Sequence, residues 1–349
     1  MLSRSRLVAL AVLILGGLVV AQPKPDLPVI QPANAKLART LEGMSSPATG
    51  LAQIEGKGVV VGTENGSLFL WLREEDKAFL ADAKPREIKG HAVPVTAVAA
   101  AGSLVASASV DGQILLWNQP ADKPLHTLRA GSPVRALAIA PDGKNVASAG
   151  DDNAVTLWDA ASGKPLRKLT GPTDWLLAVA FSPDGKVVAA GGQDGKLWAW
   201  EAASGKKLYD VAIVMPGVKD PPPVVIQALA FAPDGKKIAV GGSDARIHEV
   251  DAASGKYIRA QQGHTAGVTS VTYHAGGNLL VSSSKDRTVR LWNGTSGGMY
   301  KNLEGHTAWA EGVTLAEKGT LAVSTSADRT VRVWDLGAVP MKPATKPKK

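Results

Sequence analysis

One short pattern recurs seven times along the 349 residues of this chain, and this repeat constrains its fold more than any other feature. Each copy ends in a strand-like run that closes on a tryptophan or, in the fifth copy, on a valine. The closing residues, spaced by 46, 41, 42, 50, 42 and 42 residues, are Trp71, Trp117, Trp158, Trp200, Val250, Trp292 and Trp334. A period of this length indicates one repeat array, which can occupy the whole of such a chain as a single domain.

Within each copy, apolar and polar positions alternate with a period of two. The segment LLAVAFSPDGKVVAAGGQDGKLWAW, residues 176–200, reads as three strands joined by two Asp-Gly turns. Such turns permit the positive φ angles that tight hairpins need. A turn of the form DAASGK or EAASGK then leads into a shorter fourth strand. The sequence therefore predicts an all-β protein built from four-stranded antiparallel sheets, which are the blades of a β-propeller.

Two dipeptides are in phase with this repeat. Trp-Asp closes the copies at Trp158-Asp159 and Trp334-Asp335. Gly-His opens three copies, at Gly90-His91, Gly263-His264 and Gly305-His306. The pattern resembles the WD40-repeat family over residues 36–338, and the resemblance implies a seven-bladed propeller.

The order of the strands also predicts how the ring closes. Residues 36–44, KLARTLEGM, match residues 298–306, GMYKNLEGH, which are a fourth strand running into the next repeat. The seventh repeat ends after its third strand, at Trp334. We therefore expect the N-terminal strand to complete the last blade, which leaves no open edge between the first and last blades.

Histidine, serine and aspartate recur together in three copies and imitate a hydrolase triad. The resemblance implies instead that they form a hydrogen-bonded network with the tryptophan of their own blade. The three predicted networks are His91, Ser107 or Ser109, Asp111 and Trp117; His264, Ser282 or Ser284, Asp286 and Trp292; and His306, Ser324 or Ser326, Asp328 and Trp334. Since an enzyme needs one such constellation and not three, we expect no catalytic residues and no enzymatic activity.

Departures from the motif predict which blades are less well fastened. The histidine place holds Met44, Ser132 and Pro172 ahead of the first, third and fourth repeats. Asn65 replaces the first turn aspartate, and Val250 replaces the fifth tryptophan. We expect blades two, six and seven to be the best fastened, and blades one, four and five to depend more on their neighbours.

A partner-binding surface is expected on the rim where the first strands begin, which in this family is usually called the top. The residues just ahead of the first strands are Pro47, Pro94, Pro133, Trp175, Val225, Gly267 and Trp309. The two tryptophans come too early to be core residues of a third strand, and exposed tryptophans are common binding anchors. An insertion between blades four and five adds further candidates, which are Met215, Pro221, Pro222 and Pro223. The alternatives are that each tryptophan packs over its own blade and that the insertion is a tolerated surface loop.

Composition excludes several classes of chemistry. The chain has no cysteine, and its six histidines lack ligand spacing, so we expect no cofactor and no metal. We interpret His126, His248 and His274 as ordinary surface or strand residues. The net charge of +8 falls to +2 without Arg4, Arg6 and four tail lysines, so we expect no nucleic-acid binding.

The two ends differ from the repeat array. Residues 1–21 have two arginines, an apolar run and small residues before Gln22, which predicts a signal peptide and export to a bacterial periplasm or cell exterior. The alternative is an uncleaved N-terminal anchor. Residues 22–35 are expected to be a Pro-rich linker, and residues 339–349 a basic Pro/Lys-rich tail.

The predicted function is a monomeric, non-catalytic scaffold that binds a peptide or protein partner on the top rim. The rival class is a small-ligand binder or enzyme that uses the central channel. The Ser-Gly-Lys turns are similar to those of quinoprotein propellers, which carry a tryptophan three residues after the lysine. Here that place is held by Arg167, Tyr209 and Arg259.

Overall fold

The computed structural model describes residues 27–74, 78–81, 83–119, 123–214 and 223–339. The predicted signal peptide, the start of the linker and nearly all of the tail lie outside these residues. So do three of the proposed binding residues, Met215, Pro221 and Pro222.

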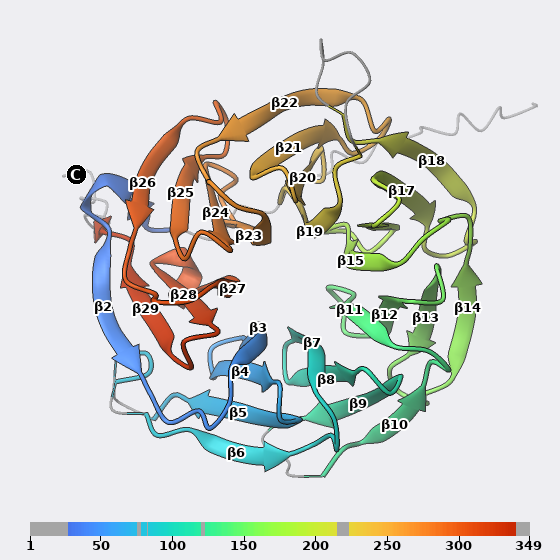
Figure 1. Ribbon diagram of the computed structural model, residues 1–349, viewed down its shortest axis with the longest axis horizontal. Helices are drawn as coiled ribbons and strands as arrows, with labels where there is room; N and C mark the ends of the chain where they lie inside the picture. The colour runs from blue at the N-terminus through green and yellow to red at the C-terminus, as the bar shows by residue number, and fades with distance from the viewer. Residues whose placement is uncertain (1–26, 75–77, 82, 120–122, 215–222, 340–349) are drawn as a thin grey trace, which may run out of the picture.

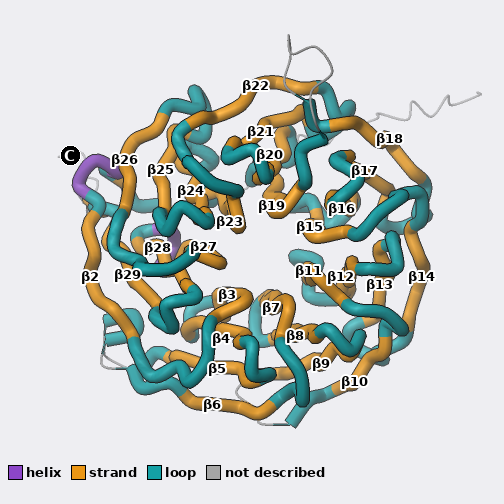
Figure 2. Tube along the Cα trace, viewed as in Figure 1, coloured by secondary structure: helices purple, strands orange, loops and turns teal. Residues whose placement is uncertain are grey.

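Seven four-stranded antiparallel sheets stand around a central channel, which confirms the predicted all-β, seven-bladed propeller (Figure 1). The only helices among the described residues are two 3₁₀ turns, η1 (Pro32–Asn34) and η2 (Glu317–Gly319) (Figure 2). In chain order, blade 1 is β3 (Ala48–Ile54), β4 (Gly58–Thr63), β5 (Ser67–Leu72) and β6 (Arg86–Lys89); blade 2 is β7 (Val95–Ala101), β8 (Leu104–Ser109), β9 (Gln113–Asn118) and β10 (His126–Arg129); blade 3 is β11 (Val134–Ile139), β12 (Asn145–Gly150), β13 (Val155–Asp159) and β14 (Pro165–Leu169); blade 4 is β15 (Leu176–Phe181), β16 (Val187–Gly192), β17 (Lys196–Glu201) and β18 (Lys207–Ala212); blade 5 is β19 (Ile226–Phe231), β20 (Lys237–Gly242), β21 (Arg246–Asp251) and β22 (Tyr257–Gln262); blade 6 is β23 (Val268–Tyr273), β24 (Leu279–Ser284), β25 (Val289–Asn293) and β26 (Met299–Leu303); blade 7 is β27 (Ala310–Ala316), β28 (Leu321–Ser326), β29 (Val331–Asp335) and β2 (Lys36–Leu41).

The first strand of every blade lines the channel, and the fourth lies on the outer circumference (Figure 1). We call the face where the inner strands begin the top rim. It also carries the turns that join second and third strands. The face where the inner strands end is the bottom rim.

The ring closes as the sequence predicts. Strand β2 pairs with β29 in blade 7, with Thr40 opposite Arg332 and Leu41 opposite Val331. A second closure was not predicted: β1 (Val29–Ile30) pairs with β30 (Ala338–Val339). Both pairings join the two ends of the chain at the bottom rim, because β2 starts there and β29 ends there.

The segment predicted to be a linker is therefore structured from Val29 onward. Ala35 and Leu336 are almost fully buried, in a cluster that joins blades 6 and 7. The nitrogen of Gln31 donates to the oxygen of Gly337, 3.1 Å away. Pro32 stands in the first turn of η1, where its missing N–H costs nothing, so this proline is compatible with local structure.

Apolar packing lies between blades rather than inside them. Each buried cluster among the described residues draws its side chains from two adjacent blades. Trp198 and Trp200 of blade 4, for example, belong to a cluster with Leu157 of blade 3. Every blade therefore needs both neighbours to remove its two faces from water.

A disulfide across the closure should test how much of the stability depends on it. Because the chain has no cysteine, Thr40→Cys with Arg332→Cys introduces a single bridge at paired positions. The matched control joins the equivalent positions of blade 3 through Thr156→Cys with Lys168→Cys. Loop entropy predicts a gain of roughly 5 to 6 kcal/mol for the long loop and roughly 3 kcal/mol for the short one. Equal shifts of Tm for the two oxidised proteins would contradict a dominant role for the closure.

Candidate functional site

In blades 6 and 7 the predicted networks are formed, and both ring nitrogens of the histidine have hydrogen-bond partners. In blade 6, His264 Nδ1 lies 2.7 Å from Asp286 and His264 Nε2 lies 2.7 Å from the Ser282 hydroxyl. The indole N–H of Trp292 donates to the same hydroxyl oxygen over 2.8 Å. Blade 7 repeats this arrangement with the residues His306, Asp328, Ser324 and Trp334, at 2.9, 2.8 and 2.8 Å.

Burial and hydrogen bonding together indicate that the networks of blades 6 and 7 have a structural role. Ser282 and Ser324 are fully buried, so neither hydroxyl faces solvent. Burial alone would raise the pKa of Asp286 and Asp328, but hydrogen bonds from histidine and threonine outweigh it. The pKa of both carboxyls lies well below its usual value. The triad-like residues of blades 6 and 7 are thus buried hydrogen-bond networks that hold the strands of one blade together.

The third network differs from the prediction. His91 Nε2 lies 2.8 Å from the Ser107 hydroxyl, and Trp117 donates to Ser107 over 3.1 Å. Asp111, however, bonds Ser109 instead of His91, and His91 Nδ1 has no partner among the described residues. Burial lowers the pKa of His91 to about 4, opposed only by the charge of Asp111.

Blades 4 and 5 lack the opening histidine but satisfy their turn aspartates from another position. Asp194 accepts the indole N–H of Trp198 over 2.9 Å, and Asp244 lies 3.1 Å from His248 Nε2. Trp198 and His248 both stand two residues before the closing residue of their repeat. His248 is fully buried, so our interpretation of it as an ordinary strand residue missed a fastening role.

The seven residues ahead of the inner strands occupy one equivalent place on the top rim. The backbone oxygen of each accepts a hydrogen bond from the first residue of the turn after the second strand of its blade. The seven bonds, 2.9 to 3.3 Å long, join Glu64 to Pro47, Val110 to Pro94, Asp151 to Pro133, Gln193 to Trp175, Ser243 to Val225, Lys285 to Gly267 and Ala327 to Trp309. The backbone is thus fixed here in every blade while the side chain is free to vary.

Trp175 and Trp309 are the only exposed tryptophans of the described chain, at 45% and 53%. They precede β15 and β27, which lie on opposite sides of the channel (Figure 1). A cation from the preceding blade stands over each ring: Arg135 lies 5.4 Å from the centre of Trp175, and Lys285 lies 5.0 Å from that of Trp309.

The described end of the insertion reaches the same rim. Pro223 is exposed and lies against Gly195, in the turn after β16 of blade 4. The backbone nitrogen of Ile213 donates to the oxygen of Gly195 over 2.9 Å, so both flanks of the insertion contact this turn. Gln193, which bonds Trp175, belongs to the same turn.

A second set of seven equivalent residues, one in each blade, lies at β-bulges of the inner strands. In every blade the pairing of first and second strands skips one residue, and each skipped residue is half-buried and follows a buried one. These bulge residues are Thr49, Thr96, Arg135, Leu177, Gln227, Thr269 and Glu311. Four of them, with Glu64 and Pro94, line a cavity of about 550 Å³ at the top end of the inner strands. Bulges re-aim side chains next to functional sites, and here four of them supply walls of this cavity, which we call the mouth of the channel.

Charges at this mouth are unevenly paired. Arg135 donates two hydrogen bonds to Asp151, at 2.8 and 2.7 Å, and this contact raises the pKa of Arg135. Glu311 is different, because burial raises its pKa, the charge of Lys285 lowers it and the charge of Glu64 raises it. No hydrogen bond or ion pair of the Glu311 side chain is present among the described residues.

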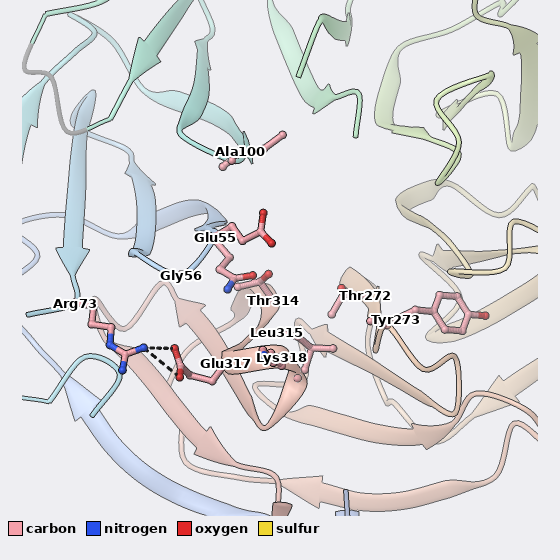
Figure 3. Close-up of a pocket in the computed structure, with 15 residues that line it drawn as sticks. Glu55, Gly56, Arg73, Ala100, Thr272, Tyr273, Thr314, Leu315, Glu317 and Lys318 are labelled. Atoms are coloured by element: carbon pink, nitrogen blue, oxygen red, sulfur yellow. Dashed lines mark hydrogen bonds and ion pairs between the residues drawn. The ribbon is translucent and has the colours of Figure 1, made fainter. Parts of the chain in front are cut away.

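The bottom end of the channel holds another cavity, of about 630 Å³ (Figure 3). Glu55 points into its open space, and Arg73 of blade 1 pairs with Glu317 of blade 7 at 3.1 Å. In that turn Glu317, Lys318 and Gly319 all have positive φ, at 49°, 54° and 84°. The strain costs roughly 1 to 2 kcal/mol for each non-glycine residue.

Sequence reasoning found the ring of residues ahead of the strands but missed the ring of bulges. The sequence did carry one signal, which is that the residue type at this equivalent position differs among the repeats. The residue directly after the first buried residue of each inner strand is Thr, Thr, Arg, Leu, Gln, Thr and Glu in turn. In six copies the flanking residues are apolar or glycine, and in blade 6 Ser270 follows, so a polar residue at this position fits ordinary strand alternation and did not reveal the bulge.

Two further features of the described residues bear on other classes of function. No group of three or more histidine, aspartate or glutamate side chains there has the arrangement to hold a metal ion. No helix in the same part of the chain has the length and apolar character needed to cross a membrane.

Comparison with known families and proteins gives one strong and one limited similarity. Five segments match the family model described as WD domain, G-beta repeat, and together they span more than half of the chain. They are residues 83–118, 122–159, 163–201, 255–293 and 297–335. A segment of 85 residues is 38% identical to telomerase protein component 1 of Mus musculus, which is 23% of this chain but only 3% of that protein.

Removing histidine should affect blades 2 and 7 differently. His306→Ala leaves Asp328 without its imidazole donor in a nearly buried place, and we expect a loss of about 3 kcal/mol in the free energy of unfolding. His91→Ala removes a ring that already lacks one partner, and we expect about 1 kcal/mol. Urea unfolding of both variants at neutral pH measures the difference, and a larger loss for His91→Ala would contradict the assignment.

The lowered pKa of His91 also predicts acid sensitivity. The unfolded chain binds a proton at this histidine near pH 6.5, whereas the folded protein does so only near pH 4. The free energy of unfolding should therefore fall as the pH drops from about 6.5 to about 4, by at most about 3 kcal/mol from this residue. His91→Gln should lose less stability than wild type between pH 7 and pH 4.5, and equal losses would refute the contribution of His91.

Proposed function

Because this chain belongs to the WD40-repeat family, whose propellers are generally non-catalytic protein-interaction scaffolds, we propose that it binds a peptide or protein partner on its top rim. The observation that carries the proposal is the pair of exposed tryptophans, Trp175 and Trp309, on opposite sides of one mouth. Every other tryptophan of the described chain is buried in a blade.

Exposure of two indole rings costs free energy unless a partner covers them. Burial of a large aromatic side chain is worth about 1.5 to 3 kcal/mol, so two half-exposed rings leave a substantial gain for an occupant. Each ring is also oriented by a stacked cation, which reduces the freedom that binding would have to remove. Rigid aromatic side chains of this kind are frequent binding hot spots.

The loops of the top rim are held in fixed positions, as a binding surface requires. Seven equivalent backbone hydrogen bonds hold its loops to the blades, so an occupant meets a pre-formed surface. Pro223 lies beside the turn below Trp175 and extends this half of the surface toward the insertion. The exported location expected from residues 1–21 is part of the proposal, and it suggests a partner from the cell envelope.

A second candidate, a small-ligand site in the channel, is favoured by the bottom cavity of about 630 Å³ and its strained turn. Backbone strain of this type is frequent at functional sites. The cavity has polar as well as apolar residues on its wall, among them Glu55 and Lys318. It shares no residue with the top rim, so the two candidates can be separated by experiment.

Affinity capture should separate them. Purified protein is exposed to an envelope fraction, and retained proteins are identified by mass spectrometry. We expect a specific protein to bind wild type and to be lost, with at least a tenfold drop in affinity, from the double variant Trp175→Ala with Trp309→Ala.

The matched control is Leu166→Ala with Leu208→Ala, which removes two equally exposed apolar side chains, at 52% and 45%, from the outer strands. Both double variants should unfold at the Tm of wild type, so that a lost contact is not a lost fold. Equal capture by the tryptophan variant would refute the top-rim site. Failure of every variant to capture any protein would favour the bottom cavity.

A further inference from the structure

Glu311 breaks the polar pattern of the bulge ring. In blade 6 the equivalent Thr269 lies 3.0 Å from the Ser283 hydroxyl and donates to the oxygen of Ala310 over 2.5 Å. Glu311 takes that place in blade 7, where Thr325 takes the place of Ser283. Thr325 is fully buried, and its hydroxyl has no partner among the described residues. The hydrogen-bonded pair of blade 6 is thus replaced by a carboxylate and a hydroxyl that leave each other unsatisfied.

A half-buried carboxylate without a partner is costly to a fold. A charge that leaves water without a compensating hydrogen bond or counter-ion destabilises the folded state, and threonine in blade 6 shows that a neutral residue fits this place. Its raised pKa is the expected sign of that cost. Unsatisfied groups of this kind at a concave surface are candidates for contact with a ligand.

The surroundings of Glu311 add negative charge and room. Glu64 is near enough to raise the pKa of Glu311 and lines the cavity of about 550 Å³. Thr49, the bulge residue of blade 1, lines the same cavity, and its buried hydroxyl has no partner among the described residues. Glu64 therefore lines the cavity on the side where blades 7 and 1 meet, and Glu311 lies near it on blade 7.

Neither neighbouring cation forms an ion pair with these two carboxylates within the described chain, although the charge of Lys285 lowers the pKa of Glu311. Lys285 stands over the ring of Trp309, and the structure shows no ion pair between it and either glutamate within the described chain. Arg135, across the cavity, is held by two hydrogen bonds to Asp151. An anionic occupant would be repelled by Glu64 and Glu311 and would find Lys285, stacked on Trp309, as the cation near them. A cationic occupant would pair with both carboxylates.

We propose that the top-rim partner presents a lysine or arginine side chain that enters the mouth of the channel and pairs with Glu311 and Glu64. An apolar side chain next to that cation packs on Trp309, which stands two residues before Glu311 on the same segment. The inference rests on the proposed function, because it names the chemistry of the partner at the same surface.

Peptide pools provide a test that needs no identified partner. The full chain, labelled with 5-fluorotryptophan, is titrated with four pools of random dodecapeptides whose central residue is fixed as Lys, Arg, Gln or Glu. Fluorine NMR reports on the two exposed tryptophans, whose signals are assigned with Trp175→Phe and Trp309→Phe. We expect the Lys and Arg pools to shift the Trp309 signal at concentrations at least tenfold below those needed for the Glu pool.

Charge-removing variants then locate the contact. Peptides selected from the Lys and Arg pools should bind Glu311→Gln about tenfold more weakly and Glu64→Gln several-fold more weakly. Glu201→Gln, an exposed carboxylate on the bottom rim, should bind them as wild type does. The Tm of Glu311→Gln should not fall below that of wild type, because the change removes a half-buried charge without a partner.

The outcomes separate this inference from the proposed function. Selection of Gln or Glu peptides, or unchanged affinity in Glu311→Gln, would overturn the cation contact, while a shift of the Trp309 signal would still support a top-rim partner. If no pool shifts either tryptophan signal, both proposals are overturned together.

Discussion

Face-to-face packing between adjacent blades is the interaction on which the rest of this structure depends. Each buried cluster is shared by two neighbours, so a blade on its own would expose both of its faces to water. That dependence explains why the chain brings an N-terminal strand back to its last blade and then adds a second, shorter pairing outside it. Without closure, the cluster between blades 7 and 1 that contains Leu41 and Trp71 could not form.

The repeat could be predicted from the sequence because burial and strand alternation are local. Trp71 and Trp334 mark third strands wherever they occur, and the match of residues 36–44 to residues 298–306 identifies the closing strand. The partner of Asp111 could not be predicted, because that aspartate lies within reach of both a histidine and a serine and only the turn geometry decides between them. The bulges depend on how two strands pair, which no single strand records.

On the top rim the backbone geometry is the same in all seven blades while the side chains differ, both at the residues ahead of the inner strands and at the bulge residues. The backbone ahead of the inner strands is held by the same hydrogen bond in all seven blades, so proline, glycine, valine and tryptophan are tolerated at one geometry. The bulge residues likewise share one backbone arrangement and range from leucine to arginine and glutamate. Chemistry on this rim can therefore change by substitution without any change in the frame, and a function specific to this chain belongs where that freedom is greatest.

The pairing of β1 with β30 has a consequence for how the molecule is presented. Val29 lies opposite Val339, so the described parts of the two chain ends lie side by side at the bottom rim. A flexible tether, a fused label or a solid support attached beside Val29 or Val339 would therefore be attached at the bottom rim. The opposite face, with Trp175 and Trp309, would then point away from an attachment made beside this pairing.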